Sequence, residues 1–221
     1  MMKYNNLSLK PLDLSSGDYG QAIKIYEDRF DEKMRADPEI ISRLARDGAD
    51  GREVLPYGLY SGDRVIGFCL LTRYKKERFV YADYISIAKD VHGSKIGEAF
   101  LFLMRDEVKR LTDTFVLFEA GHAALVRFYK SLGAGIIDCA HIMPVLDMTL
   151  ERVPGKVIIF PKLESINKDR YLECLKTILF KGYADWVTPS LGREDADIYL
   201  KYISDVYDEL KNMLPEVINV I

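Results

Sequence analysis

The chain has 221 residues, of which 48% are apolar and 29% charged, and its formal net charge is −3. This composition is typical of a globular protein, and the length fits one large domain or a domain with an extension. The charge balance gives no basic stripe for nucleic acid, and no apolar run is long enough to span a membrane, so neither partner is expected. The N-terminus lacks the apolar run of a signal peptide and the three cysteines are isolated, which predicts free thiols in a cytoplasmic protein.

Hydrophobic periodicity divides the N-terminal part into strands with period two and helices with a period near 3.6. The elements expected there are a strand over residues 7–13, helices over 17–30 and from Asp37-Pro38 to Gly48, a hairpin over 57–74 and a strand over 78–88. The elements expected next are a helix with Ile96, Phe100, Met104 and Val108 on one face, a strand over 114–120, a helix from His122 to Gly133, and strands over 135–143 and 145–153. This order predicts a mixed α/β layer structure.

The C-terminal part of the sequence has a different character. The elements expected there are one more strand over 156–160 and two amphipathic helices over 164–181 and 194–214. We therefore predict a domain over residues 1–153 and a helical extension over residues 154–221. Because large exposed apolar patches are uncommon on monomers, the helical stripes are expected to be buried. They could lie on the domain, over an acceptor site with Trp186 near its mouth, or in a dimer contact.

A strand-turn-helix junction stands out in the stretch ISIAKDVHGSKIGEAFLFLM, residues 85–104. A helix N-terminus presents unpaired backbone N–H groups and the positive end of the helix dipole, so it binds anions such as phosphate. Gly93 and Gly97 let a ligand approach the backbone, and His92 and Lys95 add positive charge. Most junctions of this kind bind nothing, so the turn by itself leaves both interpretations open.

The order of elements around this turn resembles that of the GNAT family of N-acetyltransferases. The family motif Arg/Gln-x-x-Gly-x-Gly/Ala, which binds the pyrophosphate of acetyl-CoA, falls on residues 92–97. Gly97 matches the last position, and Gly93 stands where many members have glycine. His92 replaces the Arg or Gln. Lys95 replaces the central glycine, and its side chain would either crowd the pyrophosphate or pair with it.

A second family motif, an alanine-rich helix start followed by Tyr and Leu-Gly, is matched by HAALVRFYKSLG, residues 122–133. His122 stands at the position of an asparagine that bonds the pantetheine arm in the family, and Ala134 replaces a common aromatic residue. The resemblance covers residues 7–153. It implies a mixed, mostly antiparallel central sheet flanked by helices, with acetyl-CoA as co-substrate and no metal.

In the family, an amine attacks the thioester of acetyl-CoA directly, without an acyl-enzyme. The resemblance implies that Tyr129 is the general acid that protonates the departing thiolate. The ammonium form of the amine must also lose a proton, directly or through water. Two carboxylates are candidates for this base, Glu119 at the end of one strand and Asp83 on the strand before the turn.

The cofactor-binding residues that the resemblance implies lie in three groups. They are Ile85, Ser86 and Ile87, whose backbone bonds the pantetheine; His92, Gly93, Ser94, Lys95, Ile96, Gly97 and Glu98 at the turn; and His122 and Phe128 in the second motif. His141 alternates within a late strand, where a surface or packed role is expected. No Cys/His spacing suggests a metal site, and Ser94 lacks the pattern of a nucleophile elbow.

Three functions fit these features. The first is an N-acetyltransferase for the primary amine of a small molecule, acting as a monomer or homodimer. The second is a protein acyltransferase for lysine or an N-terminus, which needs an open acceptor groove that residues 154–221 would tend to close. The third is a non-catalytic acyl-CoA-binding module, which fits the departures at His92 and Lys95. The sequence decides neither the acceptor nor the length of the acyl group.

Overall fold

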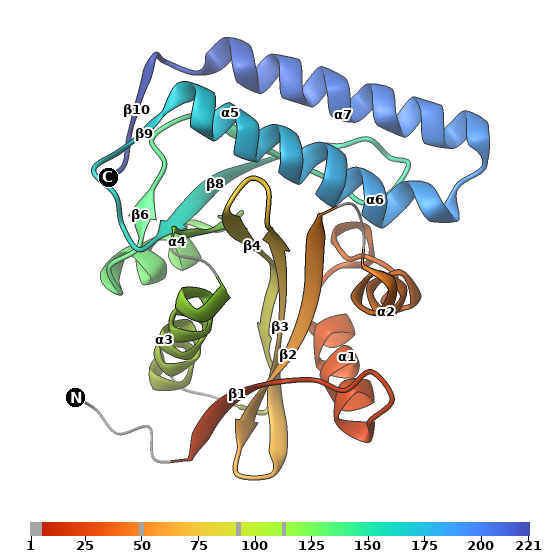
Figure 1. Cartoon of the computed structure of the whole chain (residues 1–221), viewed down its shortest axis with the longest axis vertical. Coiled ribbons are helices and arrows are strands. Elements are labelled where there is room, and N and C mark those ends of the chain that lie inside the picture. Colours follow the sequence, from red (N-terminus) through yellow and green to blue (C-terminus); the bar gives the residue numbers. More distant parts are fainter. Residues whose placement is uncertain (1–5, 49–50, 92–93, 112–113) are drawn as a thin grey trace. The chain divides into compact units, whose positions relative to one another are not determined.

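The structure, a computed structural model, describes residues 6–48, 51–91, 94–111 and 114–221. Its internal contacts divide the chain into two compact units, the first formed by Met1–Glu32 and Ile41–Val116 and the second by Lys33–Ile40 and Leu117–Ile221. The helices and strands of both units are labelled in Figure 1. The domain boundary expected after residue 153 stays a prediction.

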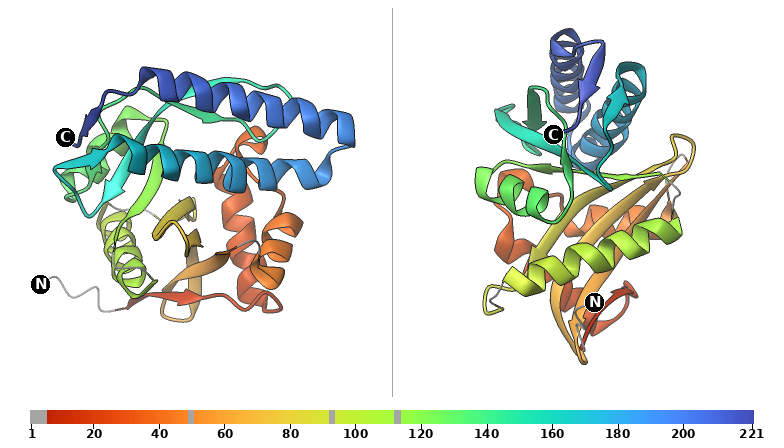
Figure 2. Two further views of the ribbon diagram at one scale, coloured as in Figure 1. Left: turned by 45° about the horizontal axis from the view of Figure 1, so that its top comes forward. Right: turned by 90° about the vertical axis from the view of Figure 1, so that its left-hand side faces the viewer.

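In the first unit, four strands pair antiparallel in the order β1-β2-β3-β4. The strands are β1 (Leu7–Pro11), β2 (Arg52–Ser61), β3 (Arg64–Tyr74) and β4 (Phe79–Ile87), and the helices are α1 (Gly17–Arg29), α3 (Ser94–Leu111) and most of α2 (Pro38–Asp47). Helix α1 covers one face of this sheet and α3 the other, as Figure 2 shows. The predicted hairpin is confirmed, with Gly62 at φ +61° in its turn.

Local signals begin and end the helices of this unit. The hydroxyl of Ser16 caps α1 by accepting from the N–H of Tyr19 at 3.2 Å. The carboxylate of Asp37 accepts from the N–H of Glu39 at 2.7 Å at the start of α2, and Gly48, at φ +66°, follows its end. Such caps satisfy backbone groups that have no partner inside the helix. The predicted start and stop of α2 are therefore confirmed.

An aromatic cluster joins α1 to the sheet. The ring of Tyr26 lies between those of Phe68 on β3 and Tyr84 on β4, at centroid distances of 5.5 and 4.7 Å. Tyr26 and Phe68 are fully buried. Aromatic pairs in this geometry contribute about 0.5–1.5 kcal/mol beyond the burial of their area. The cluster fixes the face of β4 that points away from α3.

The second unit contains β5 (whose first residue belongs to the first unit), β8 and β6 in that order, with β7 also paired to β8. Its strands are β5 (Val116–Ala120), β6 (Gly135–Ile136), β7 (His141–Pro144) and β8 (Arg152–Phe160), with β9 (Ser165–Asn167) and β10 (Val217–Asn219) as a separate pair. Its helices are α4 (Ala123–Ser131), α5 (Lys168–Thr177), α6 (Ala184–Val187) and α7 (Arg193–Met213). The short helical turns of the chain are η1 (Glu32–Met34), η2 (Ile178–Tyr183) and η3 (Thr188–Ser190).

The strand predicted over residues 145–153 is wrong. The carboxylate of Asp147 accepts from the N–H of Thr149 at 3.0 Å, and Leu150 has a positive φ of +55°, so the chain turns where the sequence alternates. The strand starts only at Arg152, and it includes the run predicted over 156–160. The strand predicted over 135–143 is divided into β6 and β7.

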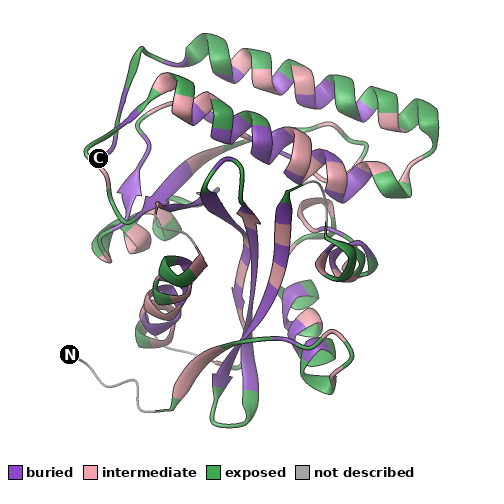
Figure 3. Cartoon of the chain, viewed as in Figure 1, coloured by how far each residue is buried: buried purple, intermediate pink, exposed green. Residues whose placement is uncertain are grey.

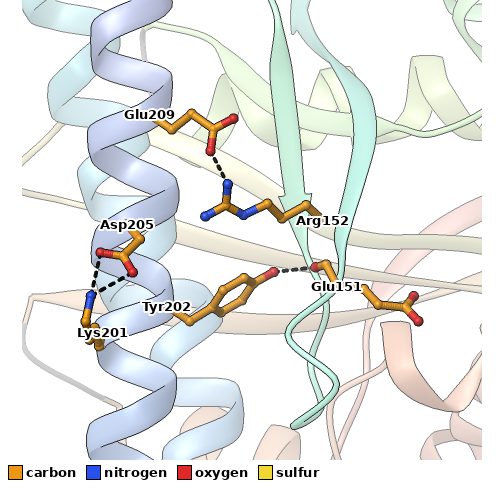
Figure 4. Close-up of polar contacts among 6 residues, drawn as sticks. All are labelled: Glu151, Arg152, Lys201, Tyr202, Asp205 and Glu209. Atoms are coloured by element: carbon orange, nitrogen blue, oxygen red, sulfur yellow. Dashed lines mark hydrogen bonds and ion pairs between the residues drawn. The ribbon is translucent and has the colours of Figure 1, made fainter.

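The C-terminal helices of the second unit bury one face and expose the other, as the colours along α5 and α7 show in Figure 3. Polar contacts tie α7 to the start of β8 (Figure 4): the hydroxyl of Tyr202 donates to the carbonyl of Glu151, and Arg152 pairs with Glu209. On the exposed side of α7, Lys201 pairs with Asp205 at 2.8 Å. Over the described residues, no helix combines the length and apolar character that crossing a membrane requires.

Candidate active site

Strand β4 of the first unit contains a bulge at Asp83. Its pairing with β3 steps from Tyr84 to Ala82 across Asp83. Bulges re-aim side chains and are frequent beside active sites. The half-buried carboxylate of Asp83 accepts a 2.7 Å hydrogen bond from the hydroxyl of Thr72 on β3. Burial raises the pKa of the Cys69 thiol, and the nearby charge of Asp83 raises it further, so Cys69 stays a neutral buried thiol.

The strand continues past the bulge to the residues expected to bind pantetheine. Ile85 and Ile87 are half-buried, whereas Ser86 is buried and its hydroxyl has no hydrogen-bond partner among the described residues. Gly67 of β3 pairs with Ile87, and a Cβ atom at this position would lie 2.8 Å from the carbonyl oxygen of Ser86. Only glycine therefore permits this close approach of the two strands.

Helix α3 begins at Ser94, directly after the turn. Its described first turn carries no acidic residue, so no side chain there opposes the positive end of the helix dipole. The predicted residues His92 and Gly93 lie outside the described part of the chain. After Ser94, Lys95 is exposed, and Ile96, Gly97 and the following Glu98 are half-buried.

Helix α4 of the second unit carries the second motif. His122 is exposed at its N-cap, where its side chain makes no capping hydrogen bond within the described residues. Tyr129 is half-buried, and its ring meets that of Phe118 on β5 edge-on, at a centroid distance of 4.8 Å. The ring of Phe128 lies beside it at 5.5 Å. The phenol of Tyr129 is thus held by its ring against β5.

Glu119 on β5 is the centre of a buried polar cluster in the second unit. The side chains of Glu119 and His141 are only 9% and 2% exposed. Nε2 of His141, on β7, contacts Oε1 of Glu119, and the hydroxyl of Tyr183 donates to Oε2. Hydrogen bonds to both oxygens favour the ionised carboxylate and oppose the effect of its burial. Nδ1 of His141 is buried and has no hydrogen-bond partner among the described residues.

Tyr183 reaches Glu119 from a π-helical turn. It is the last of the six residues of η2, which connects α5 to α6. The N–H of Ala184 bonds the carbonyl of Leu179, five residues back, as a π-turn requires. Turns of this kind are rare in proteins, and those that occur are often found at functional sites. The extra residue rotates the side chains that follow. The helix predicted over 164–181 therefore begins later, at Lys168 after strand β9, and it continues past residue 181 through η2 and α6 to Val187.

A buried phenol and a thiol lie next to the cluster. Tyr171 of α5 is fully buried, and its burial raises its pKa well above the usual value, with Cys139 and Glu119 raising it further. The ammonium group of Lys156 donates to the carbonyl of Cys139 at 3.2 Å. Within the described residues, no group of three or more His, Cys, Asp or Glu side chains could hold a metal ion.

The structure brings together some predicted residues and adds two others. Asp83 belongs to the first unit, whereas Glu119 and Tyr129 belong to the second. The packed role expected for His141 agrees with its burial, but the sequence does not predict that it or Tyr183 contacts Glu119. The one feature of the sequence that could have indicated such contacts is the carboxylate of Glu119 inside an otherwise apolar strand, because a buried charge needs hydrogen-bond donors.

Comparisons with known proteins identify the fold. No family model matches the chain, and no curated protein matches it in sequence. A protein from Bacteroides thetaiotaomicron assigned to the GNAT family of acetyltransferases superposes with a TM-score of 0.65, at 13% identity, over 79% of this chain and 98% of its own. A spermidine N-acetyltransferase from Vibrio cholerae superposes with a TM-score of 0.53, at 13% identity, over 70% of this chain and 93% of its own. A protein from Staphylococcus epidermidis assigned as an acetyltransferase superposes with a TM-score of 0.51, at 9% identity, over 70% of this chain and 98% of its own.

These similarities show that the chain has the fold of GNAT-family acetyltransferases. The expected mixed α/β architecture, with a mostly antiparallel sheet flanked by helices, is confirmed. Because one fold hosts different functions, activity must be argued from the site.

Proposed function

We propose that the chain is an N-acetyltransferase that transfers an acetyl group from acetyl-CoA to the primary amine of a small molecule. One observation carries the proposal: in a chain with this fold, the two family motifs fall at the start of α3 and on α4, with the Tyr129 ring held against β5. The polar cluster of Glu119 and His141 adds groups that can accept a proton.

Acetyl-CoA is the proposed co-substrate. Its pyrophosphate binds the backbone N–H groups of residues 93–98 at the start of α3, where a helix N-terminus favours an anion. The exposed ammonium group of Lys95 pairs with the same phosphates. The proposed pantetheine and acyl contacts come from Ile85, Ser86, Ile87, His122 and Phe128.

The proposed reaction needs both an acid and a base. A primary alkylamine has a pKa of about 10.4, so it arrives as an ammonium ion and must lose a proton before its lone pair can attack the thioester carbon. The new C–N bond forms, the C–S bond then breaks, and the departing thiolate takes the proton of the Tyr129 phenol. The nitrogen loses its second proton, which restores the phenol, so that one proton per turnover reaches solvent.

The proposed acceptor is a small molecule. One protein with this fold is a spermidine N-acetyltransferase from Vibrio cholerae, which supports an amine of that kind. The segment beyond residue 153 also contributes Tyr183 to the Glu119 cluster, which fits a part for this segment at the acceptor site.

Binding and turnover together test the proposal. Calorimetry with acetyl-CoA should give saturable binding, and a panel of polyamines, arylalkylamines and amino acids should contain an acceptor whose acetylated product appears by mass spectrometry. A panel of peptides with free lysine or N-terminal amines serves as the comparison. Turnover of peptides alone would identify a protein acyltransferase, and binding without any turnover would identify an acyl-CoA-binding module. Absence of binding would refute both the donor and the reaction.

A further inference from the structure

The contact between Glu119 and His141 fixes the tautomer of the imidazole. Oε1 of Glu119 faces Nε2 of His141, and the other carboxylate oxygen accepts from Tyr183. A carboxylic acid is a stronger acid than an imidazolium ion, so we assign the shared proton to Nε2 of the ring. In a neutral imidazole one nitrogen carries hydrogen and the other has the lone pair. The lone pair of His141 is therefore on Nδ1.

Nδ1 is the ring nitrogen of His141 that has no hydrogen-bond partner among the described residues. It is buried, on a side chain with 2% exposure, and the described residues offer it no hydrogen-bond donor. A carboxylate that orients one ring nitrogen so that the other takes a proton is the arrangement used in serine hydrolases. We infer that His141 is the proton acceptor of the proposed acetyl transfer, and that Glu119 is the residue that positions it. This inference rests on the proposed function.

Tyr183 is the second positioning residue. Its hydroxyl holds Oε2, so Glu119 keeps Oε1 directed to His141. The residue comes from the π-turn η2, and Glu119 comes from β5, 64 residues earlier in the chain. A π-turn that places its last residue on a buried carboxylate gives the C-terminal segment a part in the chemistry.

Other ionisable groups are linked to Glu119 through a series of contacts. Glu119 contacts His141 and Tyr183, the phenol of Tyr171 interacts with Glu119 and Cys139, and the ammonium group of Lys156 lies beside Cys139. Burial raises the pKa values of Tyr171 and Cys139, so both are neutral at pH 7. Lys156 is directed to the carbonyl of Cys139.

The proton balance of the step is simple. The ammonium group of the acceptor gives one proton, directly or through a water molecule, to Nδ1 of His141, which becomes an imidazolium ion paired with the Glu119 carboxylate. The neutral amine then forms the C–N bond, and the C–S bond breaks as Tyr129 protonates the thiolate. The nitrogen loses its second proton, which restores the Tyr129 phenol, and His141 returns its proton to solvent when the products leave.

NMR on protein labelled with ¹⁵N-histidine tests the tautomer in the wild-type chain. His141 should show a protonated Nε2 and an unprotonated Nδ1 at neutral pH, and the signal is assigned by its absence in H141Q. If H141Q does not fold, H92Q and H122Q assign it by elimination among the three histidines. A proton on Nδ1 in the neutral ring would overturn the inference.

The pH dependence of kcat/KM separates the two candidates for the acceptor. H141Q should lose the acidic limb of the profile and about 10²-fold or more in rate. E119Q should keep this limb, because the imidazole is still present, but should lower kcat/KM since the ring loses the carboxylate that positions it, and Y183F should lower kcat/KM less. If E119Q instead loses the limb while H141Q keeps it, Glu119 is the acceptor and the inference fails.

An exposed residue of α7 supplies the control. K201A removes one partner of the exposed Lys201–Asp205 pair, which has no contact with the cluster among the hydrogen bonds of the described residues, and should leave the profile unchanged. If the wild-type chain acetylates no amine, the proposed function fails and takes the inference with it. Turnover in a protein whose Nδ1 is protonated overturns the inference alone.

Discussion

Thr72 on β3 donates a 2.7 Å hydrogen bond to Oδ2 of Asp83, at the point where the bulge interrupts the pairing of β4. The bond joins the one predicted catalytic carboxylate of the first unit to the neighbouring strand. We expect this hydrogen bond, made within the sheet, to help keep the bulge in place, and the catalytic role of Asp83 stays a prediction.

The D83N variant tests this assignment. Asparagine has the same shape and its side-chain carbonyl can still accept from Thr72, so the bulge should persist and the thermal midpoint should change little. If His141 accepts the proton, kcat should stay within about tenfold of wild type, well short of the 10²–10⁴-fold typical of a lost base. A pH–rate profile of D83N without its acidic limb would return the role of the base to Asp83.

Replacing Tyr129 by phenylalanine should remove the proposed acid and keep its packing. The edge-on contact with Phe118 involves only the ring, which phenylalanine retains. We expect kcat to fall by about 10²–10⁴, the usual effect of losing a general acid. Calorimetry should find acetyl-CoA affinity within about twofold of wild type. An unchanged kcat on an identified acceptor would exclude Tyr129 from the chemistry.

Most elements of the fold follow from local signals, and the exceptions have local causes as well. The start of α2 is marked by Asp37 and its end by Gly48, both readable in the sequence. The segment VLDMTLE alternates as a strand does, but Asp147 bonds the backbone of Thr149 and turns the chain. Short polar side chains compete with secondary structure in this way, and hydrophobic periodicity does not detect it.

The candidate site was only partly predictable for a different reason. Tyr129 and Glu119 follow from a resemblance carried by nearby residues. His141 and Tyr183 meet Glu119 across 22 and 64 residues of sequence, and no local pattern reports such contacts. The π-turn that places Tyr183 also breaks the period on which helix prediction depends.

The K95A variant tests the proposed phosphate site. Lys95 is exposed at the start of α3, so its pairing with the pyrophosphate should contribute modestly. We expect CoA to bind more weakly by up to about fivefold, as an exposed ion pair of roughly 0.2–1 kcal/mol implies. A pantetheine thioester without phosphates should bind both proteins equally. Equal loss for both ligands would place the effect of Lys95 away from the pyrophosphate.

The N-cap of α5 supports the helix that leads into η2. The side chain of Asn167 accepts from the N–H groups of Asp169 and Arg170, at 2.9 and 3.4 Å. N167A should reduce the free energy of unfolding by about 1 kcal/mol, and N167D should restore most of it. Urea denaturation of the three proteins measures both effects. Equal stability of N167A and wild type would show that the cap contributes nothing.

The last prediction concerns alkaline pH and the buried phenol of Tyr57. Burial raises the pKa of this phenol, and the Glu107 carboxylate, which accepts a 2.7 Å hydrogen bond from its hydroxyl, raises it further. The unfolded phenol ionises near pH 10. The neutral phenol of Tyr57 therefore contributes fully to the free energy of unfolding below pH 10. This contribution is lost as pH rises toward the pKa of the folded state, by up to about 1.4 kcal/mol per pH unit. Urea denaturation from pH 8 to 11 should show a shallower decline in Y57F than in wild type, after the offset at pH 8 is removed. Parallel curves would mean that Tyr57 ionises equally in the folded and unfolded chain.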